Sequence, residues 1–351
     1  MKILEVNTEK TWRGGERQTF FALKGFTLLN QTVELVARKG FPLHTKSEKE
    51  GIKCYPVKSH LAVIPFFILS GHRYDIIHVQ TASLLTFAVL TKPFHGAKVV
   101  FTRRLDFVPK GWLTKWKYRQ ADLIVSITTP IKNILTAFGV EKQVVIPECI
   151  EKKELNADRA KNVLKDLHVS GKKIIGTTAA LVQHKDPQTL VRTIEALSKL
   201  RNDFVLLHFG EGILLPEIEK MILDRNLGNC YKLMGFQQNV EDFFSIFDVF
   251  VMSSEEEGLG SSVLDAFIYK VPVASTNAGG LAEILDGRGN LVNVKDFQAL
   301  ANQLDVVLTN PENTKITVNK AFHYANETLT VQNVHELYLN SFKKLLNKNL
   351  S

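Results

Sequence analysis

The chain alternates short apolar runs with helix-like stretches over almost its whole length, and this alternation restricts the fold more than any other feature. In the first half the expected strands, rich in Val and Ile, lie at 2–7, 32–38, 52–57, 74–80, 97–103, 122–128 and 143–148. In the second half they lie at 174–180, 204–210, 231–235, 249–254, 271–277 and 289–294. Such runs are typical of parallel sheets covered by helices on both faces. We therefore expect an α/β protein with two doubly wound, Rossmann-like sheets.

A charged segment, 151–173, separates the two series and is expected to form a linker with a short helix. The tail at 328–346 has the periodicity of a closing amphipathic helix. Two doubly wound halves in one chain place a ligand in the cleft between them, at the carboxyl ends of the strands.

Charge divides unevenly along the chain. Residues 1–150 hold 22 Lys and Arg against 11 Asp and Glu, whereas residues 151–351 hold 22 against 25. The basic half indicates an anionic partner such as a nucleic acid or a phospholipid surface, with a merely solubilising surface as the alternative.

The three cysteines are isolated in the sequence, so neither a zinc site nor a disulfide framework is expected, and a reducing cytoplasm fits best. The N-terminal residues are expected to form a strand and not a signal peptide. The longest apolar run, 61–69, is too short to span a bilayer.

The stretch SSEEEGLGSSVLDAFIYKVPVASTNAGGLAEI (253–284) combines carboxylates, glycines and a helix start. We expect Ser261 or Ser262 to cap the helix. Unpaired N–H groups at that start favour a bound anion, and Gly258 and Gly260 let the anion approach the backbone. Carboxylates beside the anion can accept hydrogen bonds from hydroxyl groups. The ligand indicated is therefore an anion that carries a polyol, such as a sugar nucleotide.

Plainer interpretations of three acidic residues stay open. Asp265 stands three residues after Ser262, as in a capping box, and would then only satisfy the helix start. Glu255 and Glu256 would be solvated loop charges.

The stretch resembles the signature of retaining glycosyltransferases of family 4, glycosyl transferases group 1, which have the GT-B fold. The family motif is a Glu, seven residues and a second Glu; Glu257 matches the first, and Asp265 stands at the second position. The resemblance implies that Glu257 contacts hydroxyls of the transferred sugar and that Asp265 holds the nucleotide ribose. It also implies two Rossmann-like domains that face a central cleft. These are an acceptor-binding domain at 1–155, to which a C-terminal helix at about 328–351 crosses back, and a donor-binding domain at 170–327.

The resemblance extends over nearly the whole chain. It implies that the backbone at Gly14 and Gly15 faces the donor diphosphate and that Lys185 binds it, whereas the arginine often found five residues earlier is Ala180 here. Glu283 matches a recurrent glutamate of the family. The donor-binding residues that it implies are Gly14, Gly15, Lys185, Gly210, Phe236, Gln237, Val240, Glu257, Gly258, Leu259, Gly260, Ser261, Ser262 and Asp265.

Many members carry a histidine after the strand at 97–103, where Thr102 stands here. The neighbouring Arg103 and Arg104 are expected to replace the positive charge missing at Ala180 or to bind an anionic acceptor, unless they form a structural salt bridge. The implied catalytic residues are thus Lys185, Glu257, Arg103 and Arg104.

No D-x-D motif occurs in the sequence, so we expect no metal site and a leaving diphosphate that the protein itself stabilises. We expect no cofactor beyond the nucleotide-sugar co-substrate, for which a UDP-sugar is the preferred choice.

The acceptor is suggested by the segment KGWLTKWKYR (110–119), which places Trp112, Trp116 and Tyr118 among basic residues. That mixture suits a membrane interface, although an ordinary helix that packs its tryptophans inward is the alternative. We expect a lipid-linked glycan or lipopolysaccharide-core acceptor and a cytoplasmic enzyme peripheral to the inner membrane. We expect no nucleic-acid partner. A sugar-nucleotide epimerase of the same fold and a catalytically impaired carbohydrate-binding protein stay open as alternatives.

Overall fold

The computed structural model describes residues 1–169 and 171–347. The chain divides into two compact units, which we call the N-terminal unit and the C-terminal unit. The first consists of residues 1–149 and the segment that begins at Thr328, and the second of residues 150–327. The assignment of acceptor binding to the first and donor binding to the second stays a prediction.

The N-terminal unit is built on a seven-stranded sheet in the order β3-β2-β1-β4-β5-β6-β7, in which every neighbouring pair is parallel. Its strands are β1 (Lys2–Asn7), β2 (Thr32–Arg38), β3 (Cys54–Val57), β4 (Ile76–Val79), β5 (Lys98–Arg103), β6 (Leu123–Ser126) and β7 (Gln143–Val145). Its helices are α1 (Gly14–Leu28), α2 (Pro42–Lys49), α3 (Val63–Ser70), α4 (Ala82–Leu90), α5 (Lys92–His95), α6 (Trp112–Gln120), α7 (Thr129–Ala137) and α15 (Val331–Asn347).

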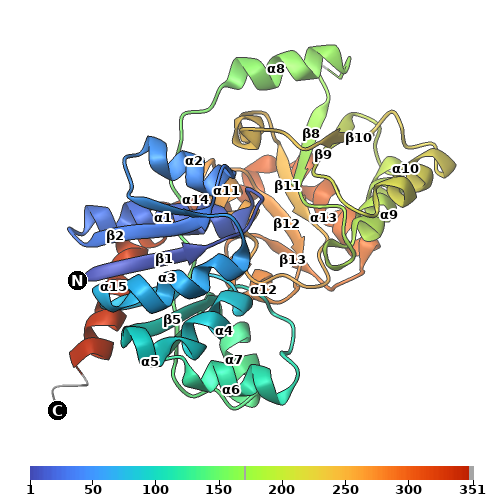
Figure 1. Cartoon of the computed structure of the whole chain (residues 1–351). Helices are drawn as coiled ribbons and strands as arrows, with labels where there is room; N and C mark the ends of the chain where they lie inside the picture. The colour runs from blue at the N-terminus through green and yellow to red at the C-terminus, as the bar shows by residue number, and fades with distance from the viewer. Residues whose placement is uncertain (170, 348–351) are drawn as a thin grey trace. The chain divides into compact units, whose positions relative to one another are not determined.

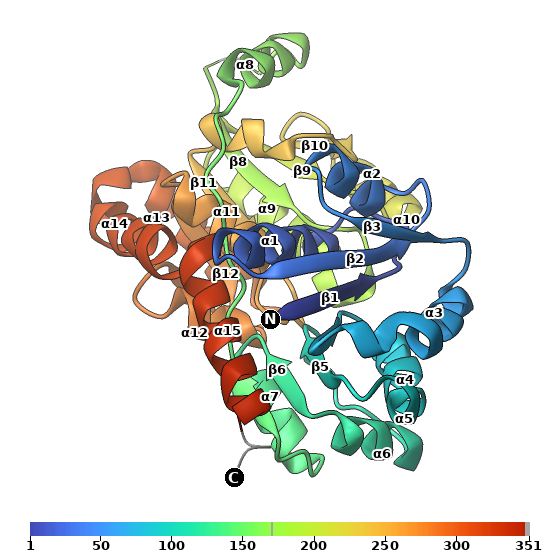
Figure 2. The same ribbon diagram turned by 60° about the vertical axis from the view of Figure 1, so that its left-hand side comes forward.

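Successive side chains of a strand point to opposite faces of the sheet, so the two faces of the N-terminal unit have different surroundings. Leu4 and Val6 of β1 join a buried cluster with residues of α3 and α4. On the other face α1 and α15 lie side by side, as Figures 1 and 2 show. Gly25 permits this close approach, because a Cβ atom there would lie 2.4 Å from the His335 ring.

The C-terminal unit has a six-stranded sheet in the order β10-β9-β8-β11-β12-β13, again parallel throughout. Its strands are β8 (Lys173–Thr178), β9 (Phe204–Phe209), β10 (Tyr231–Gly235), β11 (Val249–Met252), β12 (Val273–Thr276) and β13 (Asn290–Val292). Its helices are α8 (Ala157–Asp166), α9 (Pro187–Ser198), α10 (Leu215–Asp224), α11 (Ser261–Ile268), α12 (Gly280–Leu285), α13 (Phe297–Thr309) and α14 (Lys315–His323), and the short turns η3 (Gln183–Lys185) and η4 (Val240–Ser245) matter below.

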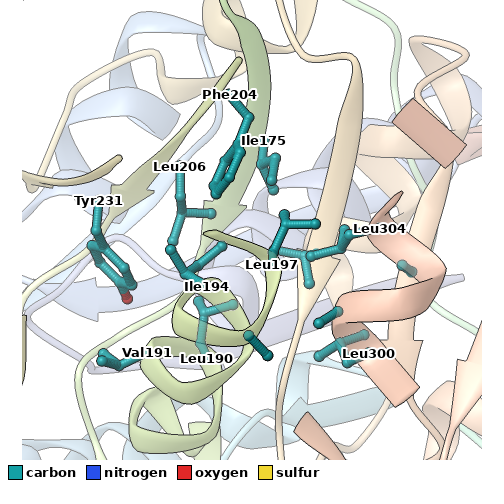
Figure 3. Close-up of a cluster of buried hydrophobic side chains, with 14 of the residues drawn as sticks. Ile175, Leu190, Val191, Ile194, Leu197, Phe204, Leu206, Tyr231, Leu300 and Leu304 are labelled. Atoms are coloured by element: carbon teal, nitrogen blue, oxygen red, sulfur yellow. The ribbon is translucent and has the colours of Figure 1, made fainter. Parts of the chain in front are cut away.

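Helix α9 shows how the sequence produces the core of the C-terminal unit. Asp186 caps the helix by accepting a hydrogen bond from the backbone N–H of Thr189, and a proline occupies the first helical position, where no N–H is needed. Apolar residues at helical spacing then form one face that packs on β8, β9 and α13 (Figure 3). They are Leu190, Val191, Ile194 and Leu197.

The fold predicted from the sequence, two doubly wound parallel sheets with a C-terminal helix that returns to the first unit, is confirmed. Several predicted strands end too late: the run 74–80 contains only β4 (Ile76–Val79), and the run 249–254 only β11 (Val249–Met252). The chain leaves the sheet at these ends and enters polar loops. None of the described helices is both long and apolar enough to cross a lipid bilayer.

Candidate active site

The candidate donor site is built at the carboxyl edge of the C-terminal sheet, where β8 and β11 are neighbours. The loop after β8 leads through η3 to Lys185 and the start of α9, and the loop after β11 carries the three glutamates. Because the carboxyl ends of parallel strands meet at one edge, residues about 70 positions apart in the sequence lie together there.

Hydrogen bonds hold the two loops against each other. The hydroxyl of Ser253 donates to the backbone oxygens of Lys185 (3.2 Å) and Asp186 (2.9 Å). The backbone N–H groups of Glu255 and Glu256 both donate to the carbonyl of His184, at 2.9 and 3.2 Å. The backbone around Lys185 is therefore held by the same loop that carries the glutamates.

The three glutamates have separate surroundings. The Glu257 carboxylate forms an ion pair with the ammonium of Lys185, and the two side chains are only 12% and 19% exposed. Glu255 pairs with Lys295 at 3.1 Å, and Glu256 is exposed to solvent. Glu257 is thus the glutamate of this run that lies beside the predicted diphosphate-binding lysine.

The helix after the glycine loop begins differently from the sequence prediction. Gly260 is the N-cap of α11, with φ of 86°, and no side-chain hydrogen bond caps the helix. The expectation that Ser261 or Ser262 is the N-cap is wrong, because a glycine adopts the left-handed conformation more readily than serine and ends the loop one residue earlier. Ser262 instead donates from its hydroxyl to the carbonyl of Thr178 (3.3 Å).

The capping-box alternative for Asp265 is wrong for the same reason, since Ser262 is the second residue of the helix and not its cap. Asp265 lies within α11 and is 6% exposed. Leu259 and Gly260 are also buried, and a Cβ atom at Gly260 would come within 2.6 Å of the Leu281 side chain. The contact of Asp265 with a ribose stays a prediction.

A second glycine loop, at the start of α12, adjoins the first. The N–H of Gly280 donates to the carbonyl of Glu257 at 2.8 Å. Glu283, the glutamate that resembles a recurrent family residue, lies in α12 with an exposed side chain, and its carbonyl accepts a hydrogen bond from Arg288 at 3.0 Å.

The remaining predicted donor residues follow β9 and β10 at this edge. Gly210 has φ of 149° and packs so closely on the loop after β8 that an added Cβ atom would lie 2.0 Å from the Ala179 oxygen. Its N–H donates to the carbonyl of Gly235 at 2.9 Å, which joins it to the loop with Phe236. Phe236 is 60% exposed, and its N–H donates to the Glu211 carboxylate at 3.2 Å. The structure therefore brings Lys185, Glu257, Gly258–Ser262, Gly210 and Phe236–Gln237 to one edge of one sheet.

In the N-terminal unit, α1 begins at Gly14 with Arg13 as its N-cap. Glu16, the third residue of the helix, closes the helix start with its side chain. The Glu16 carboxylate accepts hydrogen bonds from the N–H of Arg13 (2.9 Å) and the hydroxyl of Thr11 (3.2 Å). No atom lies within 4 Å of a Cβ atom built on Gly15, so the backbone there is accessible. The role of Gly14 and Gly15 in diphosphate binding stays a prediction.

The two neighbouring arginines after β5 have different surroundings. Arg103 is 2% exposed and donates to the hydroxyl of Tyr118 (2.7 Å) and the carbonyl of Phe107. Arg104 forms an ion pair with Glu148 (3.0 Å) and donates to the side-chain oxygen of Gln80 (2.7 Å). The structural salt bridge considered from the sequence exists for Arg104, while Arg103 is part of the packing of its unit.

Sequence reasoning missed a buried polar network in the N-terminal unit. The parallel register places Glu5 of β1 opposite His78 of β4, and the carboxylate lies 2.7 Å from Nδ1 of the imidazole. Nε2 lies 2.7 Å from the hydroxyl of Thr102, and the amide of Gln80 donates to Glu5 at 2.7 Å. Glu5 and His78 are 0% and 1% exposed. In the sequence, this network is indicated by Glu5 and His78, which stand within otherwise apolar strands.

Gln80 connects this network to Arg104. Its amide nitrogen donates to Glu5, so its oxygen faces the guanidinium of Arg104. The Thr102 hydroxyl lies 3.1 Å from the hydroxyl of Tyr338 on α15, which ties the same network to the C-terminal helix. Thr102, at the position where the resemblance implies a histidine in many family members, is thus a buried member of this network.

The segment 110–119, which was predicted to suit a membrane interface, contributes most of helix α6. Trp112 is 75% exposed and Trp116 is 39% exposed, whereas Tyr118 is buried. The alternative in which the tryptophans pack inward is therefore wrong, since the tyrosine fills the interior position. In the part of the chain that the structure describes, no three His, Cys, Asp or Glu side chains are grouped so that they could hold a metal ion.

Family models match both units of the chain. The model of glycosyl transferases group 1 matches residues 158–324, and that of glycosyltransferase family 4 matches residues 29–154. The chain belongs to the family 4 glycosyltransferases. It is accordingly a transferase with the GT-B fold, as the resemblance implied.

Relatives agree with this family assignment. The putative glycosyltransferase EpsD of Bacillus subtilis is 25% identical over 269 residues, which cover 70% of each chain. The lipopolysaccharide core biosynthesis glycosyltransferase LpsE of Rhizobium meliloti is 27% identical over 176 residues, and the match spans only about half (49%) of each protein. The crystal structure of Anabaena HepE in complex with UDP and glucose superposes with a TM-score of 0.86 at 17% identity, covering 98% of this chain and 100% of HepE.

Proposed function

We propose that this family 4 glycosyltransferase is a retaining, metal-independent enzyme that moves a sugar from a nucleotide-sugar donor to a lipid-linked glycan or a lipopolysaccharide core. The proposal is supported above all by one observation: Lys185, Glu257 and the glycine loop before α11 lie together at one sheet edge. A cation and the backbone amides of a helix start suit a diphosphate, and a carboxylate beside them suits sugar hydroxyls.

In the proposed reaction the bond between the anomeric carbon and the diphosphate oxygen breaks. A bond to an acceptor hydroxyl forms on the same face of the sugar, and that hydroxyl passes its proton to the oxygen of the leaving diphosphate. Negative charge develops on the leaving diphosphate, which Lys185 and the backbone amides at the start of α11 stabilise. Preorganised donors of this kind are worth a few kcal/mol each because they need no reorganisation as the charge develops.

A UDP-sugar is the proposed donor. The support is the likeness to HepE, which was solved with UDP and glucose. We assign the base contact to the backbone near Phe236 and Gln237, with Val240 beneath the base.

The proposed acceptor is a lipid-linked glycan or lipopolysaccharide core, and the enzyme reaches it from the cytoplasmic face of the membrane. Support comes from the excess of Lys and Arg in residues 1–150 and from the exposed Trp112. A neighbouring group of exposed apolar side chains adds to it, namely Leu105, Phe107, Val108 and Leu113. The name of LpsE points to the same class of acceptor.

The test is a turnover assay with UDP-, GDP- and ADP-sugars, each with and without a lipopolysaccharide-core or polyprenyl-linked acceptor. Transfer that persists in EDTA and gives a product with the donor's anomeric configuration supports the proposal. Isomerisation of the nucleotide sugar without an acceptor would instead identify an epimerase. Absence of both sugar transfer and nucleotide release with every donor would leave only a carbohydrate-binding protein.

A further inference from the structure

Helix α8, in the charged segment before β8, carries one arginine with an unusual number of partners. The Arg159 guanidinium donates to the carbonyl of Asn239 (3.0 Å), the carboxylate of Asp242 (2.9 Å) and the side-chain oxygen of Gln237 (3.4 Å). It also lies over the Phe243 ring, 5.4 Å from its centre. A single planar guanidinium therefore contacts four residues within a seven-residue stretch, 237–243.

The backbone that Arg159 holds is not in a relaxed conformation. Asn239 has φ of 54°, in the left-handed region that residues other than glycine adopt at a cost. The carbonyl of Asn239 is one of the groups that Arg159 binds, so the arginine stabilises this turn directly. The second carboxylate oxygen of Asp242 accepts from the N–H of Asn156, the N-cap of α8.

Two further hydrogen bonds hold the residues at the start of this loop, Phe236 and Gln237. The Glu211 carboxylate accepts from the N–H of Phe236, and the Gln237 amide nitrogen donates to the carbonyl of Met234 at 3.1 Å. The orientation of the Gln237 amide is thus set by Met234 on one side and by Arg159 on the other. These residues, 236 to 240, are the ones that we assign to the nucleobase.

We propose that Arg159 is a positioning residue for nucleobase recognition: it holds the 236–240 loop in the conformation that receives the base, without touching the diphosphate. The inference rests on the proposed function, because it needs the base to bind at this loop. Removal of Arg159 should then weaken the part of the affinity that depends on the base. The diphosphate, bound at Lys185 and the start of α11, should be unaffected.

The experiment measures dissociation constants of UDP, ADP, GDP and inorganic pyrophosphate by calorimetry on the full chain. The variants are Arg159→Gln and Arg159→Lys, and Lys161→Gln is the matched control because Lys161 is an exposed cation on the same helix. For the tightest nucleotide we expect Arg159→Gln to lose about tenfold in affinity, equivalent to one charge-assisted hydrogen bond. Pyrophosphate affinity should change less than about twofold, and Lys161→Gln should match the wild type.

Arg159→Lys keeps the charge but not the planar set of donors, so its nucleotide affinity should fall between the wild type and Arg159→Gln. Equal losses for nucleotide and pyrophosphate would overturn the inference in favour of a general structural role, as would unchanged nucleotide affinity. A wild-type protein that binds no nucleotide more tightly than pyrophosphate would refute the base contact itself. Sugar transfer without any base preference would separate that failure from failure of the proposed reaction.

Discussion

Lys185 and Glu257 form an ion pair at the carboxyl edge of the C-terminal sheet, although 72 positions separate them in the sequence. In the proposed reaction these two side chains have different ligands, since the lysine binds the diphosphate and the glutamate binds the sugar. In that reaction the donor diphosphate would compete with the Glu257 carboxylate for the Lys185 ammonium.

Replacing Lys185 with alanine should lower kcat by at least ~10²-fold, because the leaving diphosphate loses a preorganised cation. Steady-state sugar transfer measures this. Lys295→Ala is the matched control, since Lys295 pairs with the neighbouring Glu255 and is not assigned to the donor. Near-normal turnover of the Lys185 variant would remove this residue from the mechanism.

Replacing Glu257 with glutamine should have opposite effects on binding and turnover. The neutral amide no longer competes for Lys185, so UDP should bind about twofold to fivefold more tightly, the size expected for loss of one partly exposed ion pair. The kcat should fall because a sugar contact is lost. Calorimetry with UDP and a turnover assay check the two effects, and weaker UDP binding would show that the ion pair does not compete with the donor.

Gly210→Ala should destabilise the C-terminal unit by about 2–4 kcal/mol, because the new methyl group would overlap the Ala179 carbonyl and the backbone has φ of 149°. Urea unfolding measures the change. Gly228→Ala is the control, since no atom lies within 4 Å of its added Cβ atom and φ is not positive. Similar midpoints for the two variants would contradict the expected overlap.

Acid should destabilise the protein through two buried histidines. Burial lowers the pKa of His208 to about 4 and that of His335 to about 4. The unfolded chain, with histidine pKa values near 6.5, binds more protons than the folded chain between these limits. The contribution of these histidines to the free energy of unfolding should therefore be fully present above about pH 6.5. It should fall towards pH 4, by about 1.4 kcal/mol per pH unit for each histidine.

The readout is the slope of unfolding free energy against pH, compared between the wild type and His208→Gln. The absolute stability of the variant will also change, since Nε2 of His208 donates to the Ala179 carbonyl at 3.0 Å. Only the slope isolates titration of the imidazole. An unchanged slope would mean that His208 does not account for the acid sensitivity.

Membrane binding should depend on the exposed apolar side chains around α6. The double variant Trp112→Ser, Leu113→Ser should lose most of the protein that sediments with anionic liposomes at moderate salt. The matched control is Leu223→Ser, which removes a side chain that is equally exposed (75%) but lies in the C-terminal unit. Wild-type protein that stays in the supernatant would refute the membrane contact.

Local patterns were enough to predict the architecture. Val- and Ile-rich runs that alternate with helical stretches leave few arrangements other than covered parallel sheets, so the two units followed from the pattern. The closeness of Lys185 and Glu257 was also predictable in outline. Each follows a strand, and the carboxyl ends of parallel strands share an edge.

Details that depend on backbone conformation or on packing were not predictable in this way. Serine is a good N-cap by propensity, yet Gly260 holds that position because the loop reaches the helix with φ of 86°. The sequence could not decide which of Arg103 and Arg104 would be buried, because both follow the same strand and only neighbouring side chains distinguish them. Tyr118 and Phe107 bind the first, whereas Glu148 and Gln80 bind the second.

The two parallel sheets, the glycine loops at their edges and the family motif depend on residues that are near one another in the chain, so they could be predicted before folding was considered. The partners of the polar side chains could not: Glu257 pairs with Lys185, His78 with Glu5, and the 237–243 stretch with Arg159 because the folded chain brings them together. Charged and polar groups interact only over a few ångströms. Strand register and loop packing set which distant residues come within that range.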